Sequence, residues 1–372
     1  MLKRIILFFF LLFINLSVHS DNLEEIIVSG DWRDTILSEV DSSLILVTNE
    51  DIRKKQYKHF EDIAYLVPNL NFAASDSRPR YFQIRGIGER SGYEGTPNSS
   101  VGFLIDDIDF SGQAGIASVY DIDQIEIYRG PQGSRMGANS LAGMIYIKTK
   151  DPQDLFKVNG EITLGNYGRN DLSASINIPF TKNLKSRLSI RKEDFDGFRK
   201  NLFLDLSDTS KKDELSLRLK TNWLISEAAS LDLIYFDNDF DDPADIWTID
   251  GSLNTISDRP GMDSQDSSAL GINLEFPNKL NTLKVLYSET DTDVIFSYDA
   301  DWGNTQSHYP YVYDYFSETL RKRETSNLEF RLLSNDPDTT FTEKIQWLVG
   351  FSFSEIDELN NRRDDGAYGD PN

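Results

Sequence analysis

The sequence predicts an exported chain in which a signal peptide and an α/β domain precede an antiparallel transmembrane β-barrel, of which about nine strands are present. Three observations carry this prediction. The chain begins like a secretory signal, residues 21 to about 150 mix short strands with helical segments, and from about Val158 apolar and polar residues alternate. Such an alternation places one apolar face on each strand.

Composition excludes several classes of protein. The 372 residues include 38 Lys and Arg against 61 Asp and Glu, a net charge of −23. This argues against nucleic acid as a partner, because phosphate binding needs a basic face. The chain has no cysteine, which excludes disulfides and Cys-ligated metals, and its three His leave little for a His-based metal centre or a catalytic triad.

The first twenty residues have the layout of a signal peptide. Lys3 and Arg4 form a positive start, residues 5–14 are an unbroken apolar run, and Ser20 ends a cleavage site that leaves Asp21 first. Ten apolar residues are too few to span a bilayer as a helix, and a buried N-terminal helix fits the pattern less well. We expect export into a Gram-negative envelope.

The α/β domain is expected to open with a strand and a helix. Residues 44–47 are a short apolar strand, Thr48 is a helix N-cap with Asp51 as its capping-box partner, and Pro68 ends the helical pattern. Further strands are expected at 81–85, 101–105, 124–128 and 144–148, with glycine-rich turns between them.

The connections in the period-two region alternate in length. Short links are expected at 181–183, 226–229 and 277–281, and long ones at 195–213, 237–266 and 299–323. A soluble β-sandwich, the alternative, would have turns of roughly even length, whereas a transmembrane barrel has short turns on one side and long loops on the other. An aromatic girdle near strand ends is expected from Phe180, Tyr235, Phe236, Phe276, Tyr287, Trp347 and Phe351.

Three segments, in order, resemble the TonB-dependent outer-membrane receptors. They are EEIIVSG at 24–30, FQIRGIG at 82–88 with VGFLIDDI at 101–108, and IEIYRGPQG at 125–133 with GANSLAGMIYI at 137–147. Asp107 stands where the family usually has glycine. The resemblance implies an N-terminal arm with a TonB-box-like segment at 21–40, a plug domain at 41–152 and the N-terminal part of a transmembrane β-barrel at 153–372.

The resemblance also assigns roles to individual residues. The TonB-box-like segment, Glu24, Glu25, Ile26, Ile27, Val28 and Ser29, would pair as an added strand with the TonB energy-transducing protein. A strand within the chain's own sheet is the alternative. Arg85, Glu126 and Arg129 would help to seat the plug against the barrel wall; ordinary surface ion pairs, usually worth under about 1 kcal/mol, are the alternative.

No catalytic residue, metal site or cofactor is expected, and the chain is not expected to be an enzyme. Gly86 and Gly88 lack the third glycine and the helix that a phosphate loop needs. Asp106 and Asp107 are sequence neighbours, which on a strand point to opposite faces, so they are poor candidates for a glycosidase pair.

Candidate ligand contacts come from loops that the resemblance places outside the cell. They are Tyr93, His308, Tyr309, Tyr311 and Tyr313, because aromatic faces and His can grip aromatic or iron-chelating ligands. Tyr311, Tyr313 and Tyr315 alternate, so one face of a strand is the stronger alternative. The acidic residues Asp237, Asp239, Asp241, Asp242 and Asp245 are interpreted as a solvated outer loop rather than a calcium site.

The resemblance implies energy-coupled import of a scarce ligand, with a ferric siderophore as the expected cargo. The expected partners are the TonB protein, outer-membrane lipid and a small ligand such as an iron chelate, with the receptor a monomer in the Gram-negative outer membrane. A truncated non-transporting remnant and a soluble secreted β-rich binding protein are the alternatives. The family closes its barrel with about 22 strands, so the nine strands here indicate a fragment.

Overall fold

The computed structural model describes residues 26–30, 32–72, 74, 78–89, 98–136, 139–335 and 346–370. The predicted signal peptide, Glu24, Glu25 and Tyr93 lie outside these residues, and predictions on them stay predictions. The chain divides into two compact units, residues 1–41 and 42–372. In the first, β1 (Ile27–Val28) pairs antiparallel with β2 (Thr35–Ile36), and a 3-10 turn η1 (Leu37–Glu39) follows.

The second unit begins with an α/β domain on a five-stranded sheet, ordered β3-β8-β9-β6-β7. Its strands are β3 (Leu44–Thr48), β4 (Leu70–Phe72), β5 (Phe82–Ile84), β6 (Val101–Ile105), β7 (Ile108–Asp109), β8 (Ile122–Arg129) and β9 (Gly143–Thr149). Its helical segments are α2 (Asn49–Lys55), α3 (Phe60–Ala64), the 3-10 turn η2 (Ala114–Ile116) and α4 (Gly133–Met136). Each strand predicted in this domain is present.

Local sequence explains where the first helix begins and ends. The Thr48 hydroxyl accepts from the Asp51 N–H at 3.3 Å while the Asp51 carboxylate accepts from the Thr48 N–H at 3.1 Å, which is the predicted capping box. Gln56 has a left-handed φ of 57° and ends α2, so the helical pattern forms two short helices. No helix among the described residues is long and apolar enough to cross a membrane.

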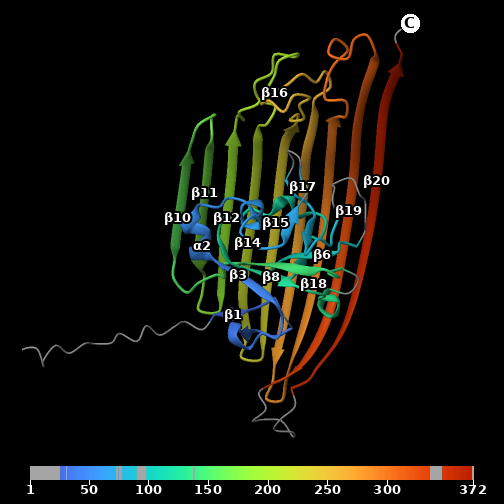
Figure 1. Cartoon of the computed structure of the whole chain (residues 1–372). Helices are drawn as coiled ribbons and strands as arrows, with labels where there is room; N and C mark the ends of the chain where they lie inside the picture. The colour runs from blue at the N-terminus through green and yellow to red at the C-terminus, as the bar shows by residue number, and fades with distance from the viewer. Residues whose placement is uncertain are drawn as a thin grey trace, which may run out of the picture. The chain divides into compact units, whose positions relative to one another are not determined.

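After the α/β domain, nine antiparallel strands follow one another in a single sheet, here called the wall. They are β10 (Lys157–Leu164), β11 (Asn170–Pro179), β12 (Leu184–Phe195), β14 (Lys212–Ser226), β15 (Ala229–Ala244), β17 (Gly261–Pro277), β18 (Asn281–Asp299), β19 (Val312–Ser334) and β20 (Leu348–Gly369). Figure 1 shows them side by side, from green β10 to red β20, with α2, β6 and β8 against one face. Among the residues that the structure describes, this agrees with the predicted number of about nine strands.

The wall is polar on its inner face, toward the α/β domain, and apolar on the other. On β11, Ser173 is 4% exposed and Leu172 is 54% exposed; on β20 the outward Phe351 is 65% exposed. A soluble sandwich would bury its apolar faces against each other. A sheet that turns its apolar face outward around a polar interior has the pattern of a transmembrane barrel, because lipid solvates that outer face.

The apolar outer face forms a belt that covers only part of each strand. On β18 the outward residues are Leu283, Val285 and Tyr287, followed by the charged Glu289 and Asp291. The strands therefore continue well beyond the apolar belt, and their upper ends lie outside the membrane-spanning segments.

Two expectations about this region are wrong. Phe236 does not join an outward girdle: it is 4% exposed and packs edge-on against Phe110 of the α/β domain, because its neighbour Tyr235 takes the outward position. The acidic run is strand rather than outer loop. Asp237, Asp239 and Asp241 are exposed on β15, and Asp242 is buried on its opposite face, whereas Asp245 is buried in the link that follows the strand.

The six links named in the prediction alternate as expected, although two of the long ones are shorter than expected. The link between β10 and β11, residues 165–169, departs from the alternation because it is short but lies on the side of the long links. Residues 180–183, 227–228 and 278–280 form the short links, and residues 196–211, 245–260 and 300–311 form the long ones. Two of the long links pair with each other in parallel, through β13 (Lys200–Asn201) and β16 (Asn254–Thr255). The long links are shorter because the strands extend past the apolar belt with charged outward residues.

Candidate functional site

Buried ion pairs join the α/β domain to the inner face of the wall. The first group, the Arg78 cluster, consists of Arg78, Glu61, Glu193 and Glu214. Arg78 Nε donates to Glu214 at 2.5 Å, Nη2 to Glu193 at 3.2 Å, and Nη1 to Glu61. The three surrounding carboxylates outweigh burial and hold the pKa of Arg78 well above its usual value, so its charge is permanent.

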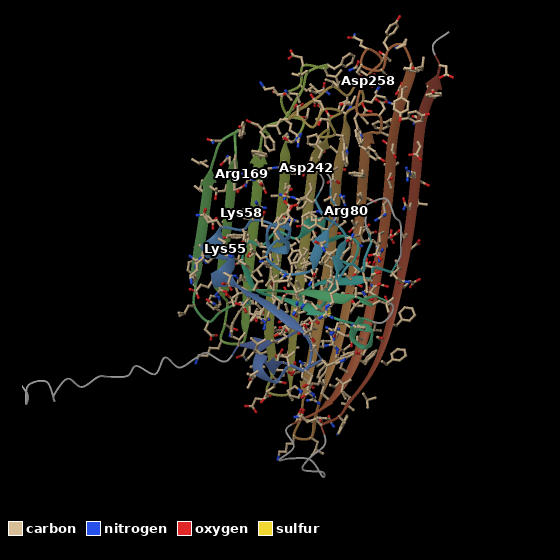
Figure 2. All side chains as sticks on the ribbon, in the orientation of Figure 1. Lys55, Lys58, Arg80, Arg169, Asp242 and Asp258 are labelled. Carbon is tan, nitrogen blue, oxygen red and sulfur yellow. The ribbon has the colours of Figure 1, made fainter. Side chains whose placement is uncertain are left out.

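A second group lies beside it. Arg80 Nη2 donates to Asp263 at 2.6 Å and its Nε donates to Gln265 at 2.9 Å, both on β17. Gln265 in turn donates to the backbone carbonyl of Gln113 at 2.9 Å, next to η2. Figure 2 shows Arg80 and Lys58 at the height of the α/β domain, whereas Asp258 lies among the loops. Side chains of opposite charge thus face each other across this contact.

Two further pairs lie at turns of the α/β domain. Asp121 accepts from Arg187 Nε at 2.7 Å and Nη2 at 2.5 Å, a two-pronged contact with β12. Asp106 accepts from Lys220 on β14 at 3.3 Å. Both aspartates have left-handed φ values, 59° and 49°, which Asp tolerates better than most residues. Together with the Arg78 and Arg80 groups, these contacts attach several edges of the domain to the wall.

The three residues predicted to seat the domain lie elsewhere. Arg85 is exposed in a turn after β5. Glu126 is fully buried in β8, where it accepts from Gln124 at 2.6 Å and Tyr128 at 2.8 Å. Arg129 ends β8 half-buried, and its backbone N–H donates to Ser43 at 2.8 Å. Their role in seating stays a prediction.

Sequence reasoning missed the residues that do make these contacts. A signal was available: Arg78 and Arg80 flank Pro79 directly before a strand, in a chain that is otherwise acidic. Arg187, Glu193, Glu214 and Lys220 occupy the polar positions of period-two strands, where small neutral residues would suffice to face water. Charged residues at those positions indicate an inner face that meets another charged surface.

The predicted ligand contacts that the structure describes lie in or beside the long link 300–311. Tyr309 is 82% exposed, and Tyr311 is also exposed. His308 Nε2 lies 3.1 Å from Asp301, and its ring packs edge-on against Tyr313 at 5.2 Å. Tyr313 and Tyr315 belong to β19, as the strand alternative holds, whereas Tyr309 and Tyr311 precede it.

A second aromatic pair lies in the same loop region. Trp247, from the link after β15, stacks on Trp302, from the link after β18, with 5.3 Å between ring centroids and 8° between planes. Nearby, burial and then the Asp314 and Asp301 carboxylates raise the pKa of Asp258. The loop region therefore offers exposed aromatic faces beside acidic groups. Such a surface suits a ligand with flat rings or hydrogen-bond donors.

No metal centre is evident in the described part of the chain, where no three or more His, Cys, Asp or Glu side chains are placed to hold a metal ion. Asp242 instead accepts from Lys212 at 2.7 Å, and Asp245 accepts from Asn201, Thr255 and Ser257. Asp242 thus joins two neighbouring wall strands, and Asp245 holds two of the long links together.

Comparison with known proteins identifies the α/β domain. Residues 37–144 match the TonB-dependent Receptor Plug Domain family. Among curated proteins, the vitamin B12 transporter BtuB of Vibrio vulnificus is 23% identical over 254 residues, which are 63% of this chain and 40% of that protein. The ferric enterobactin receptor PirA of Pseudomonas aeruginosa is 27% identical over 132 residues, 32% of this chain and 18% of that protein.

Solved structures show the same fold. The ferric yersiniabactin uptake receptor FyuA of Yersinia pestis matches with a TM-score of 0.71 and 12% identity, over 87% of this chain and 50% of that one. The ferripyoverdine receptor of the outer membrane of P. aeruginosa matches with a TM-score of 0.67 and 16% identity, over 90% and 45%. The chain thus spans half or less of the length of each of these four proteins.

These findings confirm the predictions about the fold. The α/β domain is a plug domain, and the wall has the fold of a receptor barrel. The matched proteins are named as transporters and receptors. The ferripyoverdine receptor is named as a protein of the outer membrane, which agrees with the location predicted from the sequence.

Proposed function

Because the chain carries a plug domain of the TonB-dependent receptors and a wall with the fold of their β-barrels, we propose that the protein imports a scarce ligand across the outer membrane. The observation that carries this proposal is the inside-out wall: an apolar outer belt faces lipid while a charged inner face holds the plug. The soluble secreted alternative is disfavoured, because it would leave that belt in water.

A ferric siderophore is the cargo that we propose. Several matched structures are named as receptors of ferric siderophores, and one curated relative is named as a ferric enterobactin receptor. Another relative is named as a vitamin B12 transporter, so a corrinoid is the second candidate. Uptake of radiolabelled iron chelates and of cobalamin by cells with and without the gene distinguishes the two.

The proposed mechanism requires no covalent step. Ligand contacts the outer loops and the plug, which closes the interior of the wall. Binding changes the balance of the ion pairs between plug and wall, and the arm at residues 24–29 then pairs with the TonB energy-transducing protein as an added strand. A pull on that strand rearranges the plug and opens a path. The ion pairs are charge-assisted but individually breakable contacts, which suits a seal that must open.

The arm can be tested with proline. Ile27→Pro removes the N–H that a paired strand donates, so it is expected to abolish energy-dependent uptake while ligand binding at the cell surface is unchanged. Because Ile27 lies in β1, the same change also disrupts the pairing of β1 with β2. Thr35→Pro is the matched control: it disrupts that pairing from the β2 side, outside the TonB-box-like segment, and should keep uptake. Normal uptake by Ile27→Pro would contradict the arm's role.

The loop contacts can be tested by truncating the most exposed tyrosine. Tyr309→Ala is expected to raise the Kd of the imported chelate about tenfold, the usual effect of losing one aromatic contact at a binding site. The control is Tyr167→Ala, in the outer turn between β10 and β11, where the tyrosine is 60% exposed. Equilibrium binding to whole cells checks both. Equal Kd values for the two variants would remove Tyr309 from the site.

A further inference from the structure

A large polar cavity lies between the plug and the first strands of the wall. It has a volume of about 930 Å³ and is lined by α2, by plug residues 119–123 and 150–153, and by the inner faces of β10, β11 and β12. Volumes of about 300–1,000 Å³ are typical of small-molecule sites. The cavity is separate from the outer loops, which supply none of its lining residues.

The cavity is basic, although the chain as a whole is strongly acidic. Six cations line it, Arg53, Lys58, Lys150, Lys157, Arg187 and Arg191, against the four carboxylates Asp121, Asp123, Asp151 and Glu161. In a chain with a net charge of −23, such an excess of cations is a local feature. A concave surface of one sign concentrates ions of the other sign.

Three of the four lining carboxylates are already neutralised by ion pairs within the protein. Asp121 pairs with Arg187 at 2.5 Å, Asp151 with Lys220 at 2.7 Å, and Glu161 with Lys58. Arg191 pairs with Glu193, which lies outside the lining. Among the described residues, no carboxylate lies within ion-pair distance of Arg53, Lys150 or Lys157. Three cations therefore line the cavity without an ion-pair partner, against one such carboxylate, Asp123.

The electrostatics at Lys150 agree with this geometry. Burial lowers the pKa of this half-buried amine, and the positive charges of Arg187 and Arg53 lower it further, against the opposing effects of Asp121 and Asp123. A cation that is destabilised by neighbouring cations is stabilised by any anion that enters between them.

We propose that this cavity is a binding site for a small anion with two or more negative charges, such as a phosphate or a polycarboxylate, held by Arg53, Lys150 and Lys157. Arg53 comes from α2, Lys150 from the segment after β9, and Lys157 from β10, so the anion bridges plug and wall. A second step of the proposal rests on the proposed import function: the site holds anionic cargo after the cargo leaves the outer loops. The cargo class is then an iron chelate with ionised carboxylates.

The absence of cysteine makes a clean test possible, because one introduced thiol is the sole reactive site. Asn159→Cys, on the cavity-facing side of β10, is labelled in the purified full chain with two methanethiosulfonate reagents, one carrying a sulfonate and one a trimethylammonium group. The matched control is Asn183→Cys in the exposed turn between β11 and β12. We expect the ratio of anionic to cationic labelling rates to be about tenfold higher at position 159.

Binding itself is tested with inorganic pyrophosphate. At millimolar concentration it should slow labelling of Asn159→Cys and leave Asn183→Cys unchanged. Adding Arg53→Gln, Lys150→Gln and Lys157→Gln together should abolish both the raised ratio and the protection. Lys157→Gln alone, at an exposed position, should reduce the protection and serves if the triple variant does not assemble.

Two results would overturn the site: equal labelling ratios at the two positions, or a raised ratio without protection by pyrophosphate, which would show a potential but no bound anion. Neither measurement needs transport. If pyrophosphate protects Asn159→Cys from labelling but neither the parent nor Ile27→Pro imports the chelate, the anion site is supported and the import function is refuted. If pyrophosphate protects Asn159→Cys but the triple variant still takes up a carboxylate-bearing chelate normally, the anion site stands and only its role in holding cargo is refuted.

Discussion

Replacing Arg78 with methionine is expected to destabilise the seating of the plug by about 3–5 kcal/mol, the usual cost of removing one partner from a buried ion pair. Methionine keeps much of the side-chain length but removes the charge. Glu214, which is 1% exposed, then loses the donor at 2.5 Å, and Glu193 and Glu61 lose a shared counter-charge. Hydrogen exchange of backbone amides in β8 and β9 should show the loss as faster opening of the plug.

The controls for Arg78→Met separate a seating role from a general charge effect. Lys54→Met removes a cation from an exposed pair with Glu50 on α2 and should change exchange little. The double variant Arg78→Met with Glu214→Gln should recover part of the loss, because it removes the carboxylate left buried without its guanidinium. Exchange rates in Arg78→Met equal to those in Lys54→Met would show that the Arg78 cluster contributes nothing to seating.

The second large effect is expected at Asp121. Asp121→Asn keeps the shape of the side chain and tolerates the left-handed φ of 59°, but it removes the charge that faces Arg187. Loss of these charge-assisted hydrogen bonds is expected to cost about 2–3 kcal/mol of plug stability. The free energy of plug unfolding is measured by urea denaturation. A fluorophore attached to Lys55→Cys on α2 reports the transition. Asp123→Asn, an exposed position two residues away, makes the same charge change and should have little effect.

The Asp121 contribution has a predictable pH dependence. Burial alone would raise the pKa of this carboxyl, but hydrogen bonds from Arg187 and Ser189 and the charge of Arg218 outweigh it, so the pKa lies below its usual 3.8. The stabilisation is therefore present above pH 3.8 and is lost as the pH falls through the lowered value. The difference between parent and Asp121→Asn should stay constant from pH 7 to about pH 4 and shrink below that. A difference that already shrinks between pH 7 and pH 5 would contradict this assignment.

Much of the fold could be read from the sequence because it depends on local patterns. The capping box of Thr48 and Asp51 is a contact over three residues, and the strands of the plug appear where short apolar runs end at glycine. The nine wall strands follow from alternation with period two, which is a property of each strand by itself. The glycine-rich motif at 125–133 and the RG turn at Arg85 and Gly86 pointed to a plug domain, and the family match confirms it.

The candidate site could be read only in part. The pattern indicated that polar residues of the wall face inward, but not that Arg187 meets Asp121 or that Arg78 meets Glu214, pairs separated by 66 and 136 residues. Phe236 was misplaced for a related reason, since an aromatic residue on a period-two strand fits a girdle or an interior contact equally well until the facing surface is known. The part of the acidic run at 237–242 was misread as a loop, because a charged outward strand face resembles a loop in composition.

The sequence by itself determined the kind of elements, their order and which residues share a face, because these depend on backbone periodicity and on interactions over a few residues. The tertiary structure alone decided which charges meet, that the α/β domain is held by ion pairs on the inner face of the wall, and that a basic cavity remains beside β10. Those outcomes depend on the curvature and stagger of the wall, which set distances between residues far apart in the chain. A difference of a few ångströms there separates a buried ion pair from two unpaired charges.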